Sequence, residues 1–214
     1  MGKDNNSDKL TMAGRREKGL LWVDTGENMD RQRTARGLCQ DFNHTRATDA
    51  EARREILGKL FASCGENVWI EPPLTLAMGS TVSIGDGTYI NSNLTLVDDY
   101  KIRIGKNVLI APNVTISTTN HPMHYKARAH GEMYCREVVI EDHVWIGSNA
   151  VICAGTTIGM GSVIGAGSIV TRDIPPMCFA TGAPCKVIRQ ITDDDLQEFE
   201  PIPELADGGY ANNE

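Results

Sequence analysis

The stretch IEDHVWIGSNAVICAGTTIGMGSVIGAGSIV, residues 140–170, repeats one pattern every six residues. A helix would repeat its apolar face about every 3.6 residues and a strand every second residue, so neither explains this period. A short strand followed by a turn does explain it, if three such units close one triangular coil. The large aliphatic residues that mark the repeat are Ile140, Ile146, Ile152, Ile158, Ile164 and Val170. The mostly small residues four positions after them, which suit a narrow interior, are Val144, Ala150, Thr156, Ser162 and Ser168.

The same period runs through residues 70–116, in blocks separated by slips of two residues. The aliphatic positions there are Ile70, Leu76 and Val82, then Ile84, Ile90, Leu96 and Ile102, then Ile104, Ile110 and Ile116. We expect the slips, Val82 to Ile84 and Ile102 to Ile104, to be slightly longer corners. A glycine-rich sandwich with coincidental spacing is the alternative, and the register kept over so many repeats argues against it. The sequence predicts a mainly β protein in which residues 66–186 form a hexapeptide parallel β-helix.

The segments before and after the repeat have other patterns. Residues 11–65 are predicted to be helical, because Asp49 can cap a stretch over residues 50–61 that has apolar side chains at helical spacing. Residues 187–200 fit a short amphipathic C-terminal helix. The polar tails, 1–10 and 201–214, are expected to be disordered.

Composition limits the possible functions. The formal charge is −7, which argues against nucleic-acid binding because that function needs a basic face. The first twenty residues contain no apolar core of a secretory signal, and no apolar run is long enough to cross a membrane. The six cysteines form no CxxC pair and are expected to be free thiols. These features predict a cytoplasmic protein.

A long loop at 117–138 breaks the repeat between Ile116 and Ile140. A loop of this length in a repetitive rod is typical of a functional site. His121 lies near its start, and the imidazole side chain can accept a proton from a hydroxyl at neutral pH. Pro122 follows it and would stiffen the chain there. His121 is therefore the candidate general base.

Nine strings carry a more specific signal: DFNHT (41–45), GENVWIEPP (65–73), LTLVDDY (94–100), IGKNVLIAPNVTI (104–116), NHPMH (120–124), GEMY (131–134), VWIGSNAVI (144–152), IGAGSIVTRDIPP (164–176) and GAPCKVIR (182–189). Together they resemble the galactoside and maltose O-acetyltransferases over roughly residues 11–195. Hexapeptide repeats alone would indicate only a superfamily. The HPMH loop, combined with VDDY and GAPCKVIR, is much more selective.

The resemblance implies a left-handed β-helix and a reaction. His121 would deprotonate a hydroxyl of a maltose-, glucose- or galactoside-like sugar, whose oxygen attacks the thioester of acetyl-CoA directly. The backbone N–H of Ser148 would stabilise the oxyanion. The residues matched to acceptor binding are Asp24, Asn91, Asp99 and Met133.

The resemblance also implies a donor site and an assembly. Residues matched to acetyl-CoA are Ser148, Ala166, Thr171, Arg172, Lys186 and Arg189, of which the three basic residues would hold the phosphates. No metal is required. The family forms homotrimers with each site between two subunits, and outward Val151, Val163 and Ile169 would then be covered. Trp145, with Met133, would line the tunnel between acceptor and thioester.

One departure and three alternatives stay open. Ala77 stands where the family often has a serine that contacts the sugar, which leaves the acceptor's identity open. Another acceptor, such as an amine, serine or an antibiotic, is therefore the first alternative. The second is a zinc enzyme resembling the γ-class carbonic anhydrases, which needs three converging histidines. The third is a β-helix that serves as a non-enzymatic scaffold.

Overall fold

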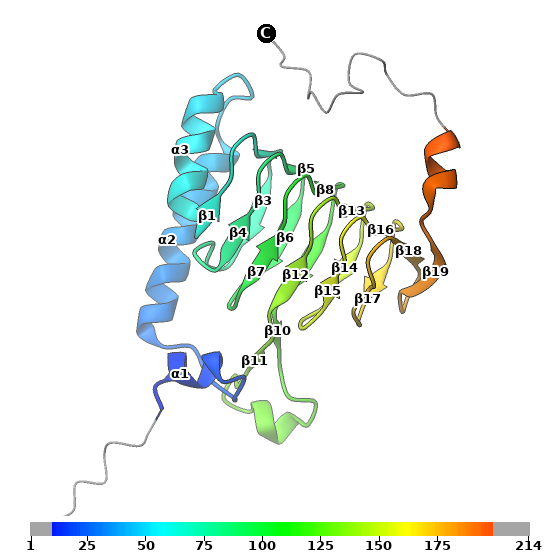
Figure 1. Ribbon diagram of the computed structural model, residues 1–214. Coiled ribbons are helices and arrows are strands. Elements are labelled where there is room, and N and C mark those ends of the chain that lie inside the picture. The colour runs from blue at the N-terminus through cyan, green and yellow to red at the C-terminus, as the bar shows by residue number, and fades with distance from the viewer. Residues whose placement is uncertain (1–9, 199–214) are drawn as a thin grey trace, which may run out of the picture.

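The computed structural model describes residues 10–198, which form a triangular β-solenoid with helices at its N-terminal end (Figure 1). Each coil adds one short strand to each of three parallel sheets. Face 1 contains β1 (Ser63–Cys64), β4 (Val82–Ile84), β7 (Ile102–Ile104), β12 (Val138–Ile140) and β15 (Thr157–Ile158). Face 2 contains β2 (Trp69–Ile70), β5 (Tyr89–Ile90), β8 (Leu109–Ile110), β13 (Trp145–Ile146), β16 (Val163–Ile164), β18 (Cys178–Thr181) and the antiparallel β19 (Lys186–Gln190). Face 3 contains β3 (Leu74–Leu76), β6 (Leu94–Val97), β9 (Thr115–Ser117), β14 (Val151–Ile152) and β17 (Ile169–Val170).

The aliphatic residues of the six-residue repeat form the core, as the sequence predicts. Ile146, for example, lies in register between Ile110 and Ile164, and all three are buried. Each such side chain contributes roughly 1.5–3 kcal/mol by leaving water. Successive coils approach so closely at the corners that a Cβ on Gly147 would lie 2.6 Å from the backbone nitrogen of Ala166. A side chain at Gly147 would therefore force the backbone of the next coil to shift.

The two slips in the repeat are not longer corners, and that expectation was wrong. They lie inside β4 and β7, where both aliphatic residues point inward and one residue between them points outward. Three-residue strands place two side chains in the core because neighbouring strand residues face opposite sides. The extra length therefore widens face 1 rather than an edge.

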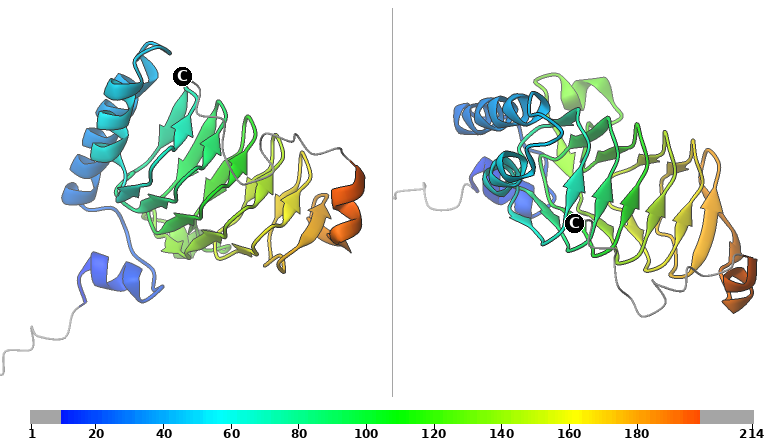
Figure 2. Two further views of the ribbon diagram at one scale, coloured as in Figure 1. Left: turned by 45° about the horizontal axis from the view of Figure 1, so that its top comes forward. Right: turned by 90° about the horizontal axis from the view of Figure 1, so that it is seen from above.

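Three helices precede the solenoid: α1 (Met12–Glu17), α2 (Gly26–Asn43) and α3 (Ala50–Leu60). The predicted cap of α3 is confirmed, because Asp49 Oδ1 accepts a hydrogen bond from the N–H of Ala52 at 3.2 Å. Helices α2 and α3 pack together and cover one end of the coils (Figure 2). The Asn43 side chain pairs with both backbone groups of Leu74 at 2.8 Å, which covers part of the exposed edge of face 3.

The C-terminal segment differs from the predicted helix over 187–200. Residues 186–190 form β19, which pairs antiparallel with β18, and a 3-10 helix, η2, covers Asp193–Glu198. The free edge of the last coil offers unpaired backbone groups, so the chain satisfies them as a strand before it turns. The remaining residues of the predicted helix, 199–200, and the predicted tails lie outside the described residues except for Leu10.

The long loop leaves the solenoid at the edge between faces 3 and 1. Its two arms pair as β10 (Thr119–Asn120) and β11 (Tyr134–Cys135), and its tip carries the 3-10 helix η1 (Tyr125–Arg128). The loop projects beside α1 (Figure 1). Within the described chain no helix is long and apolar enough to cross a membrane. All six cysteines are free, as predicted.

Candidate active site

His121 follows β10 and is exposed at the base of the loop. Its Nδ1 lies 2.8 Å from the carbonyl oxygen of Glu132, on the opposite arm. A carbonyl can only accept, so Nδ1 carries the proton and donates it, and Nε2 keeps its lone pair. The ring is thus held by its own loop in the tautomer that a general base needs.

The loop is tied down at two places. The guanidinium of Arg128 donates to the carbonyl oxygens of Pro122 and Met123. At the base, the N–H of Trp22 donates to Met133 at 2.9 Å, and the N–H of Met133 donates back to Trp22 at 2.8 Å. Because Glu132 precedes Met133, this bridge also fixes the carbonyl that orients His121.

Asp99 and Asp24 lie near this base. Asp99 is 7% exposed and accepts a hydrogen bond from Thr119 Oγ1 at 2.8 Å, two residues before His121. Burial raises the pKa of Asp24 above its ordinary value of 3.8, and the carboxylate of Asp99 raises it further. Oδ1 of Asp24 is buried without a hydrogen-bond partner. The structure therefore brings together four predicted site residues: Asp24, Asp99, His121 and Met133.

Asp98 has a structural role that its neighbour Asp99 does not share. Its buried carboxylate accepts hydrogen bonds from the N–H groups of residues 77–79 at 2.7–3.1 Å and from Thr81 Oγ1 at 2.7 Å. Burial raises the pKa of Asp98, and these hydrogen bonds oppose that rise. Ala77, the departure noted in the sequence, therefore lies in a corner that Asp98 shapes, and it offers only a methyl group.

The other predicted residues occupy a different edge of the prism. Asn91, Ser148 and Ala166 follow strands of face 2, so they lie at the edge between faces 2 and 3. Asp99 and His121 lie at the edge between faces 3 and 1, because Asp99 follows β6 of face 3 and the loop that carries His121 begins after β9 of the same face. Within one chain, face 3 separates the two groups. The N–H of Ser148 donates to no acceptor among the described residues.

The later residues matched to the donor lie near the end of the solenoid, on different faces of it. Thr171 and Arg172 follow β17 and are exposed, whereas Lys186 and Arg189 lie on β19. Arg189 is already paired, since its two terminal nitrogens lie 2.6 and 2.8 Å from the carboxylate oxygens of Asp195. These bonds, with one from the N–H of Thr192, lower the pKa of Asp195 to about 2.

Face 2 carries an apolar ladder that the sequence interpretation missed. Trp69, Tyr89, Leu109 and Trp145 stand in register on its outer side, and Leu109 and Trp145 are 48% and 52% exposed. The signal was present, because each of them directly precedes a core isoleucine and so must face outward. Of the residues predicted to form the outer apolar surface, Ile169 is exposed on face 3, and Val151 and Val163 are half-buried.

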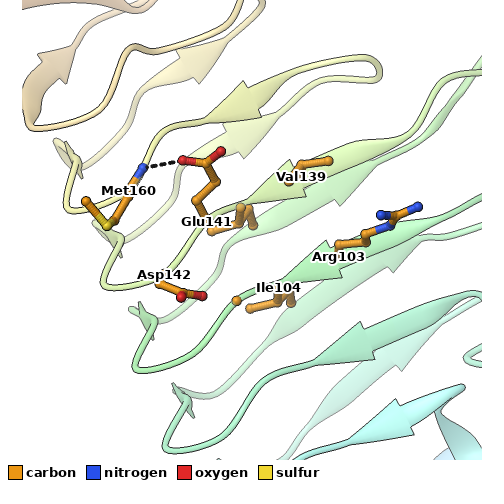
Figure 3. A pocket seen from close by; sticks show the side chains of 8 residues that line it. Arg103, Ile104, Val139, Glu141, Asp142 and Met160 are labelled. Atoms are coloured by element: carbon orange, nitrogen blue, oxygen red, sulfur yellow. Dashed lines mark hydrogen bonds between the residues drawn. The ribbon is translucent and has the colours of Figure 1, made fainter.

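A hollow of about 360 Å³ lies elsewhere on the solenoid, and none of the predicted site residues lines it (Figure 3). It lies over face 1, between Arg103 and Met160, and Glu141 accepts a 2.7 Å hydrogen bond there from the N–H of Met160.

In the loop, His124 and His130 contact Lys126 and Glu132 respectively rather than His121. Among residues 10–198, no three potential metal ligands of the His, Cys, Asp or Glu type converge.

Two protein families match parts of the chain. Residues 23–65 match the maltose acetyltransferase hexapeptide capping motif, and residues 137–172 match the bacterial transferase hexapeptide of six repeats. The first match covers α2 and α3, and the second covers the last regular coils.

Individual proteins are similar over almost the whole chain. The galactoside O-acetyltransferase of Escherichia coli K12 is 49% identical over 191 residues, which are 89% of this chain and 94% of that protein. A structure of a galactoside acetyltransferase in complex with coenzyme A is 46% identical, with a TM-score of 0.85, and the match covers 88% of this chain and 94% of that one. A maltose O-acetyltransferase from Clostridium difficile 630 is 36% identical, with a TM-score of 0.83 over 86% of this chain and 98% of that one. The solenoid is accordingly a left-handed β-helix of about six turns.

Proposed function

We propose a reaction for this chain from one premise: it belongs to the galactoside and maltose O-acetyltransferase family of hexapeptide-repeat acyltransferases. It is an acetyl-CoA-dependent O-acetyltransferase. Its acceptor is a hydroxyl of a galactoside- or maltose-like sugar, and His121 is the general base. The observation that carries this proposal is the hydrogen bond from His121 Nδ1 to Glu132, beside the carboxylates of Asp24 and Asp99.

The reaction is a direct transfer. Nε2 of His121 removes the proton of the sugar hydroxyl as its oxygen attacks the thioester carbonyl of acetyl-CoA. The resulting oxyanion accepts a hydrogen bond from the N–H of Ser148. The intermediate collapses by breaking the carbon–sulfur bond, and the imidazolium returns its proton to the departing thiolate. The products are an acetyl ester and free CoA.

The active site requires a second subunit. His121 and Asp99 lie on one edge of the prism, and Asn91, Ser148 and Ala166 lie on another, so one chain cannot surround the reacting atoms. In a homotrimer, the first edge of one subunit meets the second edge of its neighbour. The ladder on face 2 supports this arrangement, because contiguous exposed apolar side chains are typical of a surface that a partner covers. Trp145 would then lie at the interface, beside the thioester.

The donor extends along the later coils. Thr171 and Arg172 lie on the edge between faces 3 and 1, which also carries Asp99 and His121 and which we call the catalytic edge. Lys186 and Arg189 lie on the terminal strand, so the phosphates of CoA would bind near the end of the solenoid. Lysine and arginine side chains are suited to these phosphates. Because the reaction consumes acetyl-CoA and the cysteines are free, we place it in the reducing cytoplasm.

The acceptor can be identified by following CoA release with a panel of galactosides, maltose, glucose, amines and serine. We expect turnover with at least one sugar. Turnover restricted to amines or serine would favour the alternative acceptors, which the absence of a hydroxyl at Ala77 keeps open. No turnover with any acceptor would contradict the proposal.

Mixed oligomers test whether the site is shared. His121→Ala and Asn91→Ala variants remove groups from different edges, so each homotrimer has three damaged sites. Co-assembly of the two would restore some intact sites only if the edges come from different subunits. We expect activity to reappear after the variants are unfolded and refolded together. Activity that stays at the level of the separate variants would place the whole site in one chain.

A further inference from the structure

The N-terminal strap, residues 11–24, is fastened to the catalytic edge at two places. On α1, Glu17 accepts hydrogen bonds from Tyr100 Oη and Lys101 Nζ, both at 3.1 Å. These two residues directly follow Asp99. At the other end, Trp22 forms the two-bond bridge to Met133 in the catalytic loop. The strap therefore cannot shift independently of the groups around His121.

Arg16 is the unusual residue of the strap. Its side chain lies over the ring of Trp22, with 5.3 Å from guanidinium carbon to ring centroid, and the residue is only 8% exposed. Its Nε and Nη1 atoms are buried without a hydrogen-bond partner. Burying donors of a charged group without partners is costly. Such a group is therefore expected to find its partner in a bound molecule.

Asp24 has a buried hydrogen-bond acceptor that lacks a donor, whereas Arg16 has buried donors that lack an acceptor. Its Oδ1 is also buried without a partner, and among residues 10–198 Arg16 and Asp24 form neither an ion pair nor a hydrogen bond with each other. Both charges nevertheless act on one another, since Arg16 and Arg36 oppose the rise that burial and Asp99 cause in the pKa of Asp24. Gln32 also opposes the rise in the pKa of Asp24 through hydrogen bonding, and its amide nitrogen lies 3.4 Å from Oδ1 of Asp99.

We propose that Arg16 and Asp24 together bind one hydroxyl of the acceptor, a hydroxyl other than the one that is acetylated. The guanidinium donates to the hydroxyl oxygen, and the hydroxyl donates to the carboxylate of Asp24. A hydroxyl satisfies both groups because it donates and accepts, whereas an ammonium or a carboxylate would satisfy only one of them. Arg16 is thus a specificity residue for polyhydroxylated acceptors, and this inference rests on the proposed sugar acceptor.

The test compares the best sugar acceptor with its monodeoxy analogues, in the wild-type protein and in Arg16→Met. In the wild type, one analogue should lose about 10- to 100-fold in kcat/KM, the usual effect of a hydrogen bond to a charged group. In Arg16→Met, the parent sugar should lose a similar factor, and the further loss for that analogue should disappear. The KM for acetyl-CoA should stay unchanged, and the Tm should stay unchanged or rise, because the variant removes a buried charge whose donors lack partners. Lys18→Met, which removes an exposed charge beside the same helix, is the control and should retain the wild-type pattern.

Each other outcome has a definite meaning. If Arg16→Met discriminates against every analogue as the wild type does, Arg16 binds no acceptor hydroxyl and the inference is overturned. If the KM for acetyl-CoA rises and the Tm falls together with the change in acceptor kinetics, the role of Arg16 is structural and the inference is overturned. If the wild type turns over no sugar, the proposed function itself fails. Should Arg16→Met not fold, Arg16→Lys serves in its place, since a displaced ammonium must weaken the same discrimination.

Discussion

The regular coils and the strap-and-loop region obey different rules. In the coils, buried polar side chains such as Thr88 and Ser162 are hydrogen-bonded, and identical aliphatic positions stack without interruption. In the strap and loop, Arg16 and Asp24 leave buried polar atoms unpaired, and the carboxylate of Asp99 lies close to a second carboxylate. The coils are built for stability and hold the edges in register. The strap and loop retain unsatisfied groups that a ligand can satisfy.

The substitution His121→Ala should distinguish the two regions most clearly, because it should change activity and not stability. If His121 is the general base, as proposed, its loss should lower kcat by about 10²- to 10⁴-fold with little change in Tm. His124→Ala, in the same loop, is the matched control, because its ring bonds only within the loop tip and should leave the rate nearly unchanged. CoA release measures both. A near wild-type rate in His121→Ala would contradict the proposed mechanism.

Ile158→Ala should have the opposite profile. Ile158 is fully buried in register with Ile140, so truncation should reduce the free energy of unfolding by about 2–5 kcal/mol. The kcat of the folded fraction should be retained. Urea unfolding at fixed protein concentration measures the loss, and Thr157→Ala, on the outer side of the same strand, should cost far less. Equal losses would contradict the inward and outward alternation.

Asp98→Asn, compared with Asp99→Asn, tests whether Asp98 stabilises the coils while its neighbour Asp99 binds the acceptor. An amide cannot accept all the hydrogen bonds that Asp98 receives from three backbone N–H groups and Thr81, so stability should fall by about 1–3 kcal/mol. Asp99→Asn should instead weaken acceptor binding at nearly unchanged Tm. Thermal unfolding and acceptor KM distinguish the two variants. The same effect from both would show that they share a role.

A smaller effect concerns pH. In the proposed site, acceptor binding needs ionised Asp24. Burial and Asp99 raise the pKa of this carboxyl, so affinity should fall as the pH drops through a value above 3.8. Arg36 lowers this pKa, and Arg36→Gln should therefore move the fall to higher pH. Calorimetry on the His121→Ala protein avoids titration of the base. Arg33→Gln, whose side chain pairs with Asp30 instead, is the control and should not move it.

The smallest expected effect is at the donor end. Asp195 holds Arg189 in a pair that persists from neutral pH down to about pH 2, where the carboxylate is protonated. Asp195→Asn should release the guanidinium for the CoA phosphates and lower the KM for acetyl-CoA a few-fold at most, as the modest strength of exposed pairs implies. Initial-rate kinetics at varied acetyl-CoA would detect this. A higher KM would mean that the pair positions Arg189 for binding.

Local pattern was sufficient for much of this protein. The six-residue period predicts the solenoid because each isoleucine must stack on its counterpart in the next coil. Asp49 predicts its helix because capping is a local hydrogen bond, and His121 stands out because it lies where the period breaks. The resemblance in the strings around these residues supplied the reaction.

Tertiary structure decided the rest, because it depends on contacts between distant segments. Residues 187–190 became a strand rather than a helix because the last coil offers an unpaired edge, which no local pattern reveals. The division of the proposed site residues between two edges follows from which face each strand joins. Arg16 looks like one more surface cation in the sequence, and only the folding of the strap over the catalytic edge buries it beside Asp24. The sequence determines the rod and its one break, whereas long-range packing determines which side chains meet there.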